Sequence, residues 1–190
     1  MFNLDPGKDY KVIGEPVDHA DAHQLAHDDR YQFLWWALST IQAMPLGGQE
    51  GKKEGKKGAD RTIDGVINFI DDPKGKLSQV LVQVKNGNVN SGLIRDLRGI
   101  IERDNAAIGV FITLEPPTSE MKKEAVSAGF YTSPIYNQKY PRLQILCIED
   151  LLKGEKVKMP PTVSTFNKAE RVKKVQAEQT SLDLDGNPPE

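Results

Sequence analysis

The central part of the chain contains two strand-like runs separated by a turn. Thr62–Ile70 alternates apolar and polar residues and is rich in β-branched types. Asp71–Gly75 has the composition of a turn, and Ser78–Lys85 (SQVLVQVK) is a second run of strand length. Runs of this kind joined by Gly, Pro and Asp are typical of a hairpin. The pattern therefore predicts two paired strands.

Helical and strand patterns alternate after the hairpin. Ser91–Asp104 has apolar residues at i, i+1, i+4, i+7 and i+8, which is one face of a helix. Ala106–Leu114 is a continuous apolar run, as expected for a strand buried on both faces. Thr118–Ala128 is predicted to be a helix that begins at an N-cap Thr118 and stops at Gly129. Leu143–Ile148 is a further buried strand that leads into a short helix around residues 150–153.

The N-terminal part contains a strongly apolar helical segment, Asp29–Met44. Asp29 and Gln32 have the spacing of a capping box at its start. The expected order is helix, hairpin, helix, strand, helix, strand. This order predicts an α/β fold with a central mixed sheet of about four to five strands flanked by helices.

Composition and charge narrow the class of protein. The 190 residues carry 25 Lys and Arg against 27 Asp and Glu, so the net charge of -2 excludes a globally basic nucleic-acid coat but allows a local basic surface. Apolar stretches such as Phe33–Leu38 are far too short to cross a bilayer. A single cysteine, Cys147, rules out an internal disulfide and is expected in the core. We therefore expect a soluble cytoplasmic protein.

Composition also suggests where the parts of the chain divide. Residues 1–44 are expected to form a strand and helical segment that packs on the core. Residues 45–59 are rich in Gly and Lys and predict a basic, flexible loop. The core itself is assigned to residues 60–158, and the polar residues 159–190 predict a disordered tail.

Three residues of the predicted hairpin are unnecessary for strand pairing. Asp64 lies just inside a strand, where aspartate is disfavoured, and Gln83 and Lys85 project to one face because side chains alternate. Carboxylate and amide oxygens suit a hard cation such as Mg²⁺, and an ammonium group can orient or deprotonate water or neutralise developing charge. Metal-dependent phosphodiester hydrolysis needs such groups. The alternative is that Asp64 caps turn amides and the other two residues lie on a solvated strand face.

Asp64 followed by Gln83-Val-Lys85 resembles the PD-(D/E)xK nuclease core in its Asp…Gln-x-Lys form, as in Mrr-like restriction endonucleases. The resemblance spans roughly Gly58 to Leu152. It implies a restriction-endonuclease-like fold and a Mg²⁺-dependent deoxyribonuclease of restriction-modification or defence, with Mn²⁺ as a substitute. Tyr10–Leu38 also resembles the segment preceding such domains where they are fused behind a DNA methyltransferase. DNA, a methyltransferase and a second copy of the chain are the partners implied.

The resemblance assigns roles to residues. Asp64 and Gln83 would bind the metal, and Lys85 would assist the attacking water. Asp60 matches an acidic position before the metal-binding acid, whereas Thr62 stands where glycines are common. Many members also have a glutamate on the first helix, for which Gln32 is the nearest candidate here. One ion is favoured because Gln83 brings no charge to offset a second.

Basic side chains and a tail peptide are further candidates. Arg95 and Arg98 could contact phosphates, although the polar face of a helix needs no such role. The chain end resembles the Q-x-x-L-x-L peptide that docks bacterial DNA-processing proteins on the sliding clamp, with an unstructured end as the alternative. The other candidate DNA contacts are Lys52, Lys53, Lys56, Lys57 and Arg61, and the clamp peptide would use Gln179, Leu182 and Leu184.

All three histidines lie at i, i+4 and i+8 of a predicted helix, at His19, His23 and His27. Neighbouring pairs have metal-ligand spacing, but all three span about 12 Å and cannot share one ion. An exposed polar face is the favoured interpretation, and no zinc site is expected. For the whole chain the alternative function is a catalytically silent DNA-binding or regulatory module associated with a DNA methyltransferase.

Overall fold

The computed structural model describes residues 15–46 and 63–161. Five helices and seven strands follow one another in this part of the chain. The helices are α1 (His19–Asp28), α2 (Arg30–Thr40), α3 (Ser91–Arg103), α4 (Ser119–Ser127) and α5 (Ile148–Leu152). The strands are β1 (Met44–Pro45), β2 (Gly65–Ile70), β3 (Leu77–Lys85), β4 (Ile108–Thr113), β5 (Phe130–Thr132), β6 (Lys139–Pro141) and β7 (Leu143–Cys147).

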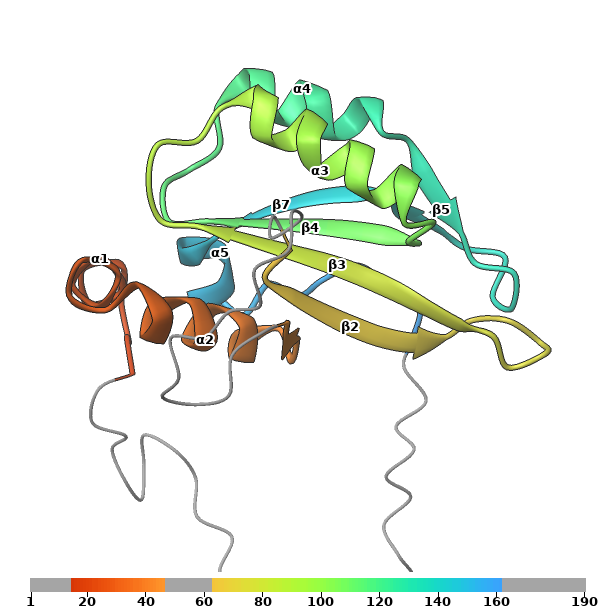
Figure 1. Ribbon diagram of the computed structural model, residues 1–190, viewed down its shortest axis with the longest axis horizontal. Helices are drawn as coiled ribbons and strands as arrows, with labels where there is room; N and C mark the ends of the chain where they lie inside the picture. Colours follow the sequence, from red (N-terminus) through yellow and green to blue (C-terminus); the bar gives the residue numbers. More distant parts are fainter. Residues whose placement is uncertain (1–14, 47–62, 162–190) are drawn as a thin grey trace, which may run out of the picture.

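Five strands form one mixed sheet in the order β1-β2-β3-β4-β7. β2 and β3 pair antiparallel as the predicted hairpin, whereas β3, β4 and β7 run parallel to one another. Helices α3 and α4 lie on one face of the sheet, and α2 and α5 lie on the other (Figure 1). The predicted α/β fold with a mixed sheet flanked by helices is therefore confirmed.

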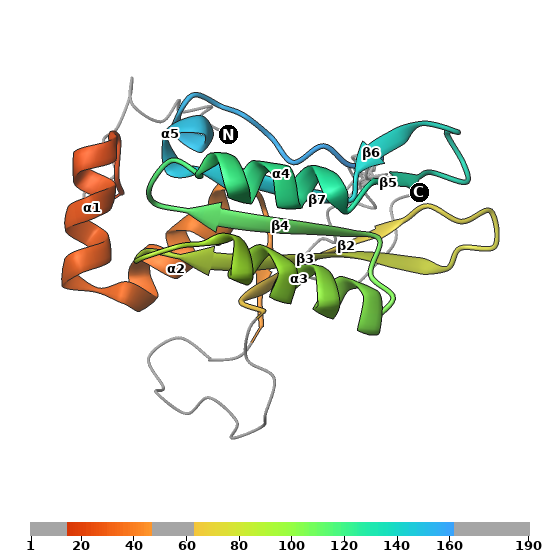
Figure 2. The ribbon, with the colours of Figure 1, turned by 90° about the horizontal axis from the view of Figure 1, so that it is seen from above.

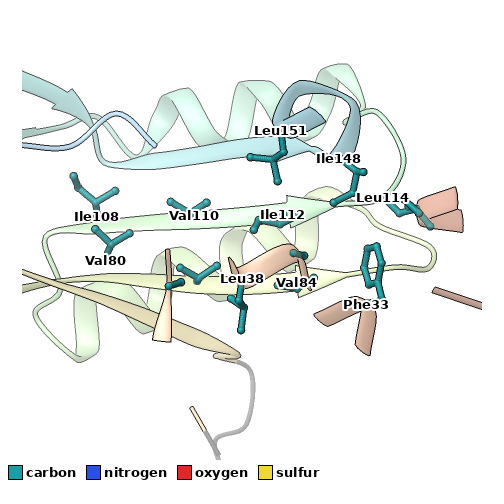
Figure 3. Packing of buried hydrophobic residues seen from close by; sticks show 14 of the residues in the cluster. Phe33, Leu38, Val80, Val84, Ile108, Val110, Ile112, Leu114, Ile148 and Leu151 are labelled. Atoms are coloured by element: carbon teal, nitrogen blue, oxygen red, sulfur yellow. The ribbon is translucent and has the colours of Figure 1, made fainter. Parts of the chain in front are cut away.

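Alternation along the two central strands divides the core into two clusters. Even-numbered side chains such as Val80 and Val110 belong to a cluster that also contains residues of α1, α2 and α5. Figure 3 shows part of this cluster from close by. Odd-numbered side chains such as Leu81 and Phe111 pack against α3 and α4. All six residues of β4 are buried, which confirms the continuous apolar run as a strand covered on both faces.

The helix α3 packs directly against β4. Its apolar stripe of Ile94, Leu97 and Ile101 is buried, and its first turn is capped by the side chain of Asn90, which accepts from the backbone of Gly92. A Cβ atom added at Gly109 would lie 2.2 Å from Cδ1 of Ile101. A side chain at this position of β4 would therefore require the Ile101 side chain to move.

The N-terminal part differs in detail from the prediction. A helix was expected over Asp29–Met44, but α2 ends at Thr40, and Met44–Pro45 forms the edge strand β1. Asp29 caps α2 through the backbone N–H groups of residues 31 and 32. The side chain of Gln32 is exposed and makes no return bond within the described residues, so only half of the predicted capping box forms.

Two short strands, β5 and β6, were not predicted. They pair antiparallel over three residues each, which is too short for an alternating pattern to stand out. Residues 47–59 of the predicted basic loop, and the tail beyond residue 161, lie outside the described part of the chain. Met159, at the start of the predicted tail, packs against the core. No helix in the described part is long and apolar enough to cross a membrane.

A buried carboxylate ties the β2–β3 turn to the β5–β6 hairpin. Asp71 is 1% exposed and accepts hydrogen bonds from the hydroxyl groups of Tyr131, at 2.8 Å, and Ser133, at 2.6 Å. Burial and the hydrogen bond to Asp71 raise the pKa of Tyr131 to about 12. The phenol therefore remains a donor at physiological pH.

Replacement of this carboxylate tests the connection. Asp71→Ala leaves the two hydroxyl groups without their acceptor, and we expect the free energy of unfolding to fall by about 1–3 kcal/mol. Urea denaturation monitored by circular dichroism measures the change. The exposed Asp96 on α3 is the matched control, because Asp96→Ala is expected to change stability by less than about 0.5 kcal/mol. Equal effects of the two variants would contradict the assignment.

Candidate functional site

Asp64 precedes β2 at a local irregularity of the hairpin. Gly65 is paired with Val82 in the strand register, yet the backbone N–H of Asp64 also donates to the carbonyl of Val82 at 2.8 Å. Two consecutive residues therefore oppose one residue of β3, as in a β-bulge. Bulges redirect side chains at the ends of strand pairs, and this one places the Asp64 carboxylate against the end of β3.

The Asp64 carboxylate is only partly satisfied by the protein. Its Oδ2 accepts a hydrogen bond of 2.8 Å from the backbone N–H of Val84, and Oδ1 accepts none from the described residues. Burial raises the pKa of Asp64, while that hydrogen bond and the positive charges of Lys85 and Arg30 act in the opposite direction. Because Val84 directly precedes Lys85 on β3, the hydrogen bond from Val84 places the predicted acid and the predicted amine at the same end of the sheet.

Gln83 is a fully buried amide in the central strand. Its exposure is 0%, and neither Nε2 nor Oε1 has a hydrogen-bond partner within the described residues. On the neighbouring strand β4, Oγ1 of the buried Thr113 also has no hydrogen-bond partner within the described residues. An amide buried without partners typically destabilises a protein by about 1–3 kcal/mol. Such groups need an explanation beyond the packing of the sheet.

Strand register brings these polar groups to one face. Gln83 and Lys85 are two residues apart on β3 and therefore share a face, and Lys85 is paired with Thr113 in the parallel register of β3 and β4. This face is the one that carries Leu81 and Phe111 towards α3 and α4. Lys85 is partly exposed at the last position of β3 and forms no ion pair with the described residues. Its ammonium group is therefore available to a ligand.

The donor set fits one hard cation. Oδ1 of Asp64 and Oε1 of Gln83 receive no hydrogen bond from the described residues, and oxygen atoms are the ligands that Mg²⁺ prefers. Mg²⁺ usually keeps several waters and takes only one or two carboxylates from the protein. A single carboxylate with a neutral amide matches one such ion better than two.

The other predicted site residues lie elsewhere or outside the described part. Arg95 and Arg98 on α3 form ion pairs with Glu124, at 4.0 Å, and with Glu102, at 3.1 Å. Gln32 is exposed on α2, and its role near the metal remains a prediction. The residues outside the described part are Asp60, Lys52, Lys53, Lys56, Lys57, Arg61, Gln179, Leu182 and Leu184.

Two residues near the site were missed in the sequence. Thr113 ends an otherwise apolar strand, and a polar residue at the end of such a run could have indicated a site at this end of the sheet. Burial raises the pKa of Asp64, and the charge of Arg30 acts in the opposite direction. No local sequence pattern could indicate this interaction, because 34 positions of sequence separate the two residues. Cys147 is buried as predicted, and Oδ2 of Asp150 caps the start of α5 by accepting from the backbone N–H of Cys147 at 3.2 Å.

The orphaned amide gives a prediction about stability. Gln83→Met fills a similar volume without polar atoms, so we expect the free energy of unfolding to rise by about 1–3 kcal/mol in the absence of metal. Gln144 on β7 is the matched control, because its amide bonds to Pro141 and twice to Lys158. Gln144→Met should destabilise the protein. Chemical denaturation measures the free energy of unfolding of both variants. A lower value for Gln83→Met than for the wild type would contradict the prediction.

The carboxylate gives a prediction about pH. Because burial raises the pKa of Asp64 in the folded protein, the unfolded chain releases this proton first, and stability falls as pH rises from 3.8 through the folded value. Asp64→Asn keeps an acceptor for the N–H of Val84 and removes the charge. We expect the variant to be more stable than the wild type near neutral pH, with the difference vanishing below pH 3.8. Urea denaturation across this pH range measures it, and a difference independent of pH would contradict the assignment.

Solved structures with a similar fold are restriction endonucleases. The chain superposes on the MspJI restriction endonuclease, solved in complex with a 27-mer oligonucleotide, with a TM-score of 0.50 and 13% identity over 80% of this chain and 34% of that chain. The DNA modification-dependent restriction endonuclease AspBHI gives a TM-score of 0.46 and 12% identity over 69% of this chain and 32% of that chain. The chain thus spans about a third of either enzyme's length, and at this identity the likeness concerns the fold alone.

Comparison of the sequence with curated proteins gives no significant match. A family model, in contrast, matches residues 47–153, which is more than half of the chain and includes the hairpin with Asp64, Gln83 and Lys85. The model describes the NACHT-associated inactive restriction endonuclease 1 domain. The fold and this match together show that the chain belongs to the NACHT-associated inactive restriction endonuclease 1 family.

Proposed function

We propose that this restriction-endonuclease-like domain is a metal-dependent DNA endonuclease of the Mrr-like, Asp…Gln-x-Lys type. The observation that carries the proposal is a pair of oxygens, on Asp64 and Gln83, that receive no hydrogen bond from the described residues. They lie at the sheet end where Lys85 also lies, and Lys85 forms no ion pair in the described part of the chain. A packed scaffold gains nothing from a buried amide without partners. A hydrolytic site uses such an amide as a ligand.

The three side chains have separate roles in this proposal. Asp64 and Gln83 would hold one Mg²⁺ or Mn²⁺, which when bound supplies charge stabilisation at the phosphate and a more acidic water. The hydrogen bond from Val84 fixes Oδ2 of Asp64 and leaves Oδ1 for the ligand. Lys85 would orient the attacking water or neutralise the charge that develops on the phosphate oxygens.

DNA is the proposed substrate because of the fold and the chemistry of the site. MspJI, which shares the fold, was solved with an oligonucleotide. A cationic side chain beside a metal site is suited to a phosphodiester, and the products would carry 5′-phosphates. One site per chain cuts one strand at a time, so cleavage of both strands would require a homodimer or two encounters. An adjacent or fused DNA methyltransferase would place the activity in restriction-modification.

A catalytically silent DNA-binding or regulatory module is the second candidate. The family is described as inactive. The Gln83 amide is also fully covered in the structure, so a hydrated ion reaches it only if the surrounding residues move. A single carboxylate holds an ion less tightly than the two or three acids of many Mg²⁺ sites. In this reading the nuclease core is retained as a scaffold for DNA.

Nicking of supercoiled plasmid DNA in Mg²⁺ or Mn²⁺ tests the first candidate. We expect wild-type nicking, and a loss of at least about 100-fold in Lys85→Ala and in Asp64→Asn because each removes a group that acts in the transition state. DNA retention in gel shifts should remain nearly unchanged in both variants. Gel electrophoresis of the plasmid forms, with end-labelling for 5′-phosphates, provides the measurement.

Lys76 is the matched control for Lys85. It is an exposed lysine next to the opposite end of β3, so Lys76→Ala should retain wild-type nicking. DNA retention by a wild-type protein that cleaves in neither metal would reject the endonuclease and support the silent module. Loss of DNA retention by the wild type at low salt would reject both candidates.

A further inference from the structure

Two histidines and a glutamate meet at the end of β4, on a different set of residues from the proposed nuclease site. His19 and His23 lie one turn apart on α1, and Glu115 follows β4 in the segment that leads to α4. One ligand atom from each of the three residues lies within 4.8 Å of the others. Figure 2 shows α1 beside the end of β4, where this segment begins.

Local contacts hold the three side chains towards one another. Nε2 of His23 lies 2.7 Å from Oε1 of Glu115, and the rings of His19 and His23 pack edge to face with centroids 4.7 Å apart. Asp18 fixes the start of α1 by accepting from the N–H of Asp21 at 2.8 Å. The i, i+4 spacing on this helix then keeps both rings on one side.

The tautomer of His19 suits a metal ligand. Its Nε2 lies 3.2 Å from the carbonyl oxygen of Leu114, and because a carbonyl only accepts, Nε2 must carry the proton. A neutral ring protonated at Nε2 presents an unprotonated Nδ1. Metal-binding histidines commonly donate their other N–H to a backbone carbonyl in this way, which fixes the ring orientation.

We propose that His19, His23 and Glu115 bind a divalent zinc ion that links α1 to the end of β4. Two imidazoles and one carboxylate are a ligand set that zinc uses when a fourth position is left to solvent. Ligand atoms around a tetrahedral zinc ion lie about 3.4 Å apart, so the present arrangement needs only small side-chain rotations to close on the ion. His23 and Glu115 are partly exposed, at 46% and 54%, which leaves that fourth position open to water.

The ion would act on the fold rather than on DNA. Leu114, which anchors His19, donates its backbone N–H to the carbonyl of Lys85 at 3.1 Å. In addition, Nδ2 of Asn86 donates to the carbonyl of Ala26 on α1 at 3.2 Å. Bound zinc would therefore strengthen the existing contact between the N-terminal helix and the ends of the two central parallel strands. This site is independent of the proposed Mg²⁺ site, and either proposal can fail without the other.

Isothermal titration calorimetry of the full chain with Zn²⁺, after removal of any histidine tag, tests the site. We expect one Zn²⁺ per chain, and affinity reduced by about tenfold or more in His23→Ala and in Glu115→Gln. The thermal midpoint should rise with Zn²⁺ in the wild type and much less in these variants, because the ion binds the folded state. Circular dichroism without metal checks that both variants fold.

His27 provides the control within the same helix. It is 86% exposed on its side chain and contacts Asp28 rather than the cluster. The chain has three histidines, and its one cysteine is buried, so His27→Ala removes the remaining histidine without touching the proposed ligands. His27→Ala and Asp64→Asn should bind Zn²⁺ like the wild type. Absence of binding in the wild type, or equal weakening by His27→Ala and His23→Ala, would overturn the proposal.

Discussion

The buried amide of Gln83 is the constraint on which the interpretation of this molecule depends. It lies in a central strand between two apolar layers, where neither polar atom finds a partner among the described residues. The fold tolerates it because its neighbours bury large apolar side chains on both faces, including Phe111 at the paired position. A single destabilising residue in an otherwise well-packed core is typical of a residue that binds a ligand.

The position of this amide follows from the topology. β3 receives an antiparallel neighbour on one side and a parallel neighbour on the other, so its carboxyl end meets the start of β2 and the end of β4. Side chains from the start of β2, the end of β3 and the end of β4 therefore lie close together, and the Gln-x-Lys pair is on β3. The same end is crossed by α1, which brings its histidines to Glu115. The groups proposed as metal ligands gather here because parallel strands end at the same edge and leave space beyond them.

Periodicity predicted the elements that have strong local patterns. The hairpin, α3 and the fully buried β4 were predicted because alternation, the 3.6-residue stripe and continuous apolarity each extend over six residues or more. Strand alternation also placed Gln83 and Lys85 on one face. The three-residue strands β5 and β6 carry too little pattern, and the bulge at Asp64 depends on hydrogen bonds to β3 that no local signal encodes. The contact between His23 and Glu115 joins residues 92 positions apart, so helical spacing alone favoured an exposed face.

The family is described as inactive, yet this chain has the residues of the proposed site. The two facts are compatible if a metal ion cannot reach the Gln83 amide. The acid, the amide and the amine of the proposed hydrolytic site are all present, and the hydrogen bond from Val84 holds Asp64 against the end of β3 beside Lys85. Covering Gln83 would silence such a site without changing any of these residues, because an ion that cannot reach Oε1 loses one of its two protein ligands. In the proposed nuclease, activity would then depend on movement of the side chains that cover Gln83. Gln83 lies on the face of β3 that carries Leu81 towards α3 and α4, so the packing of this layer would separate the proposed nuclease from a silent scaffold.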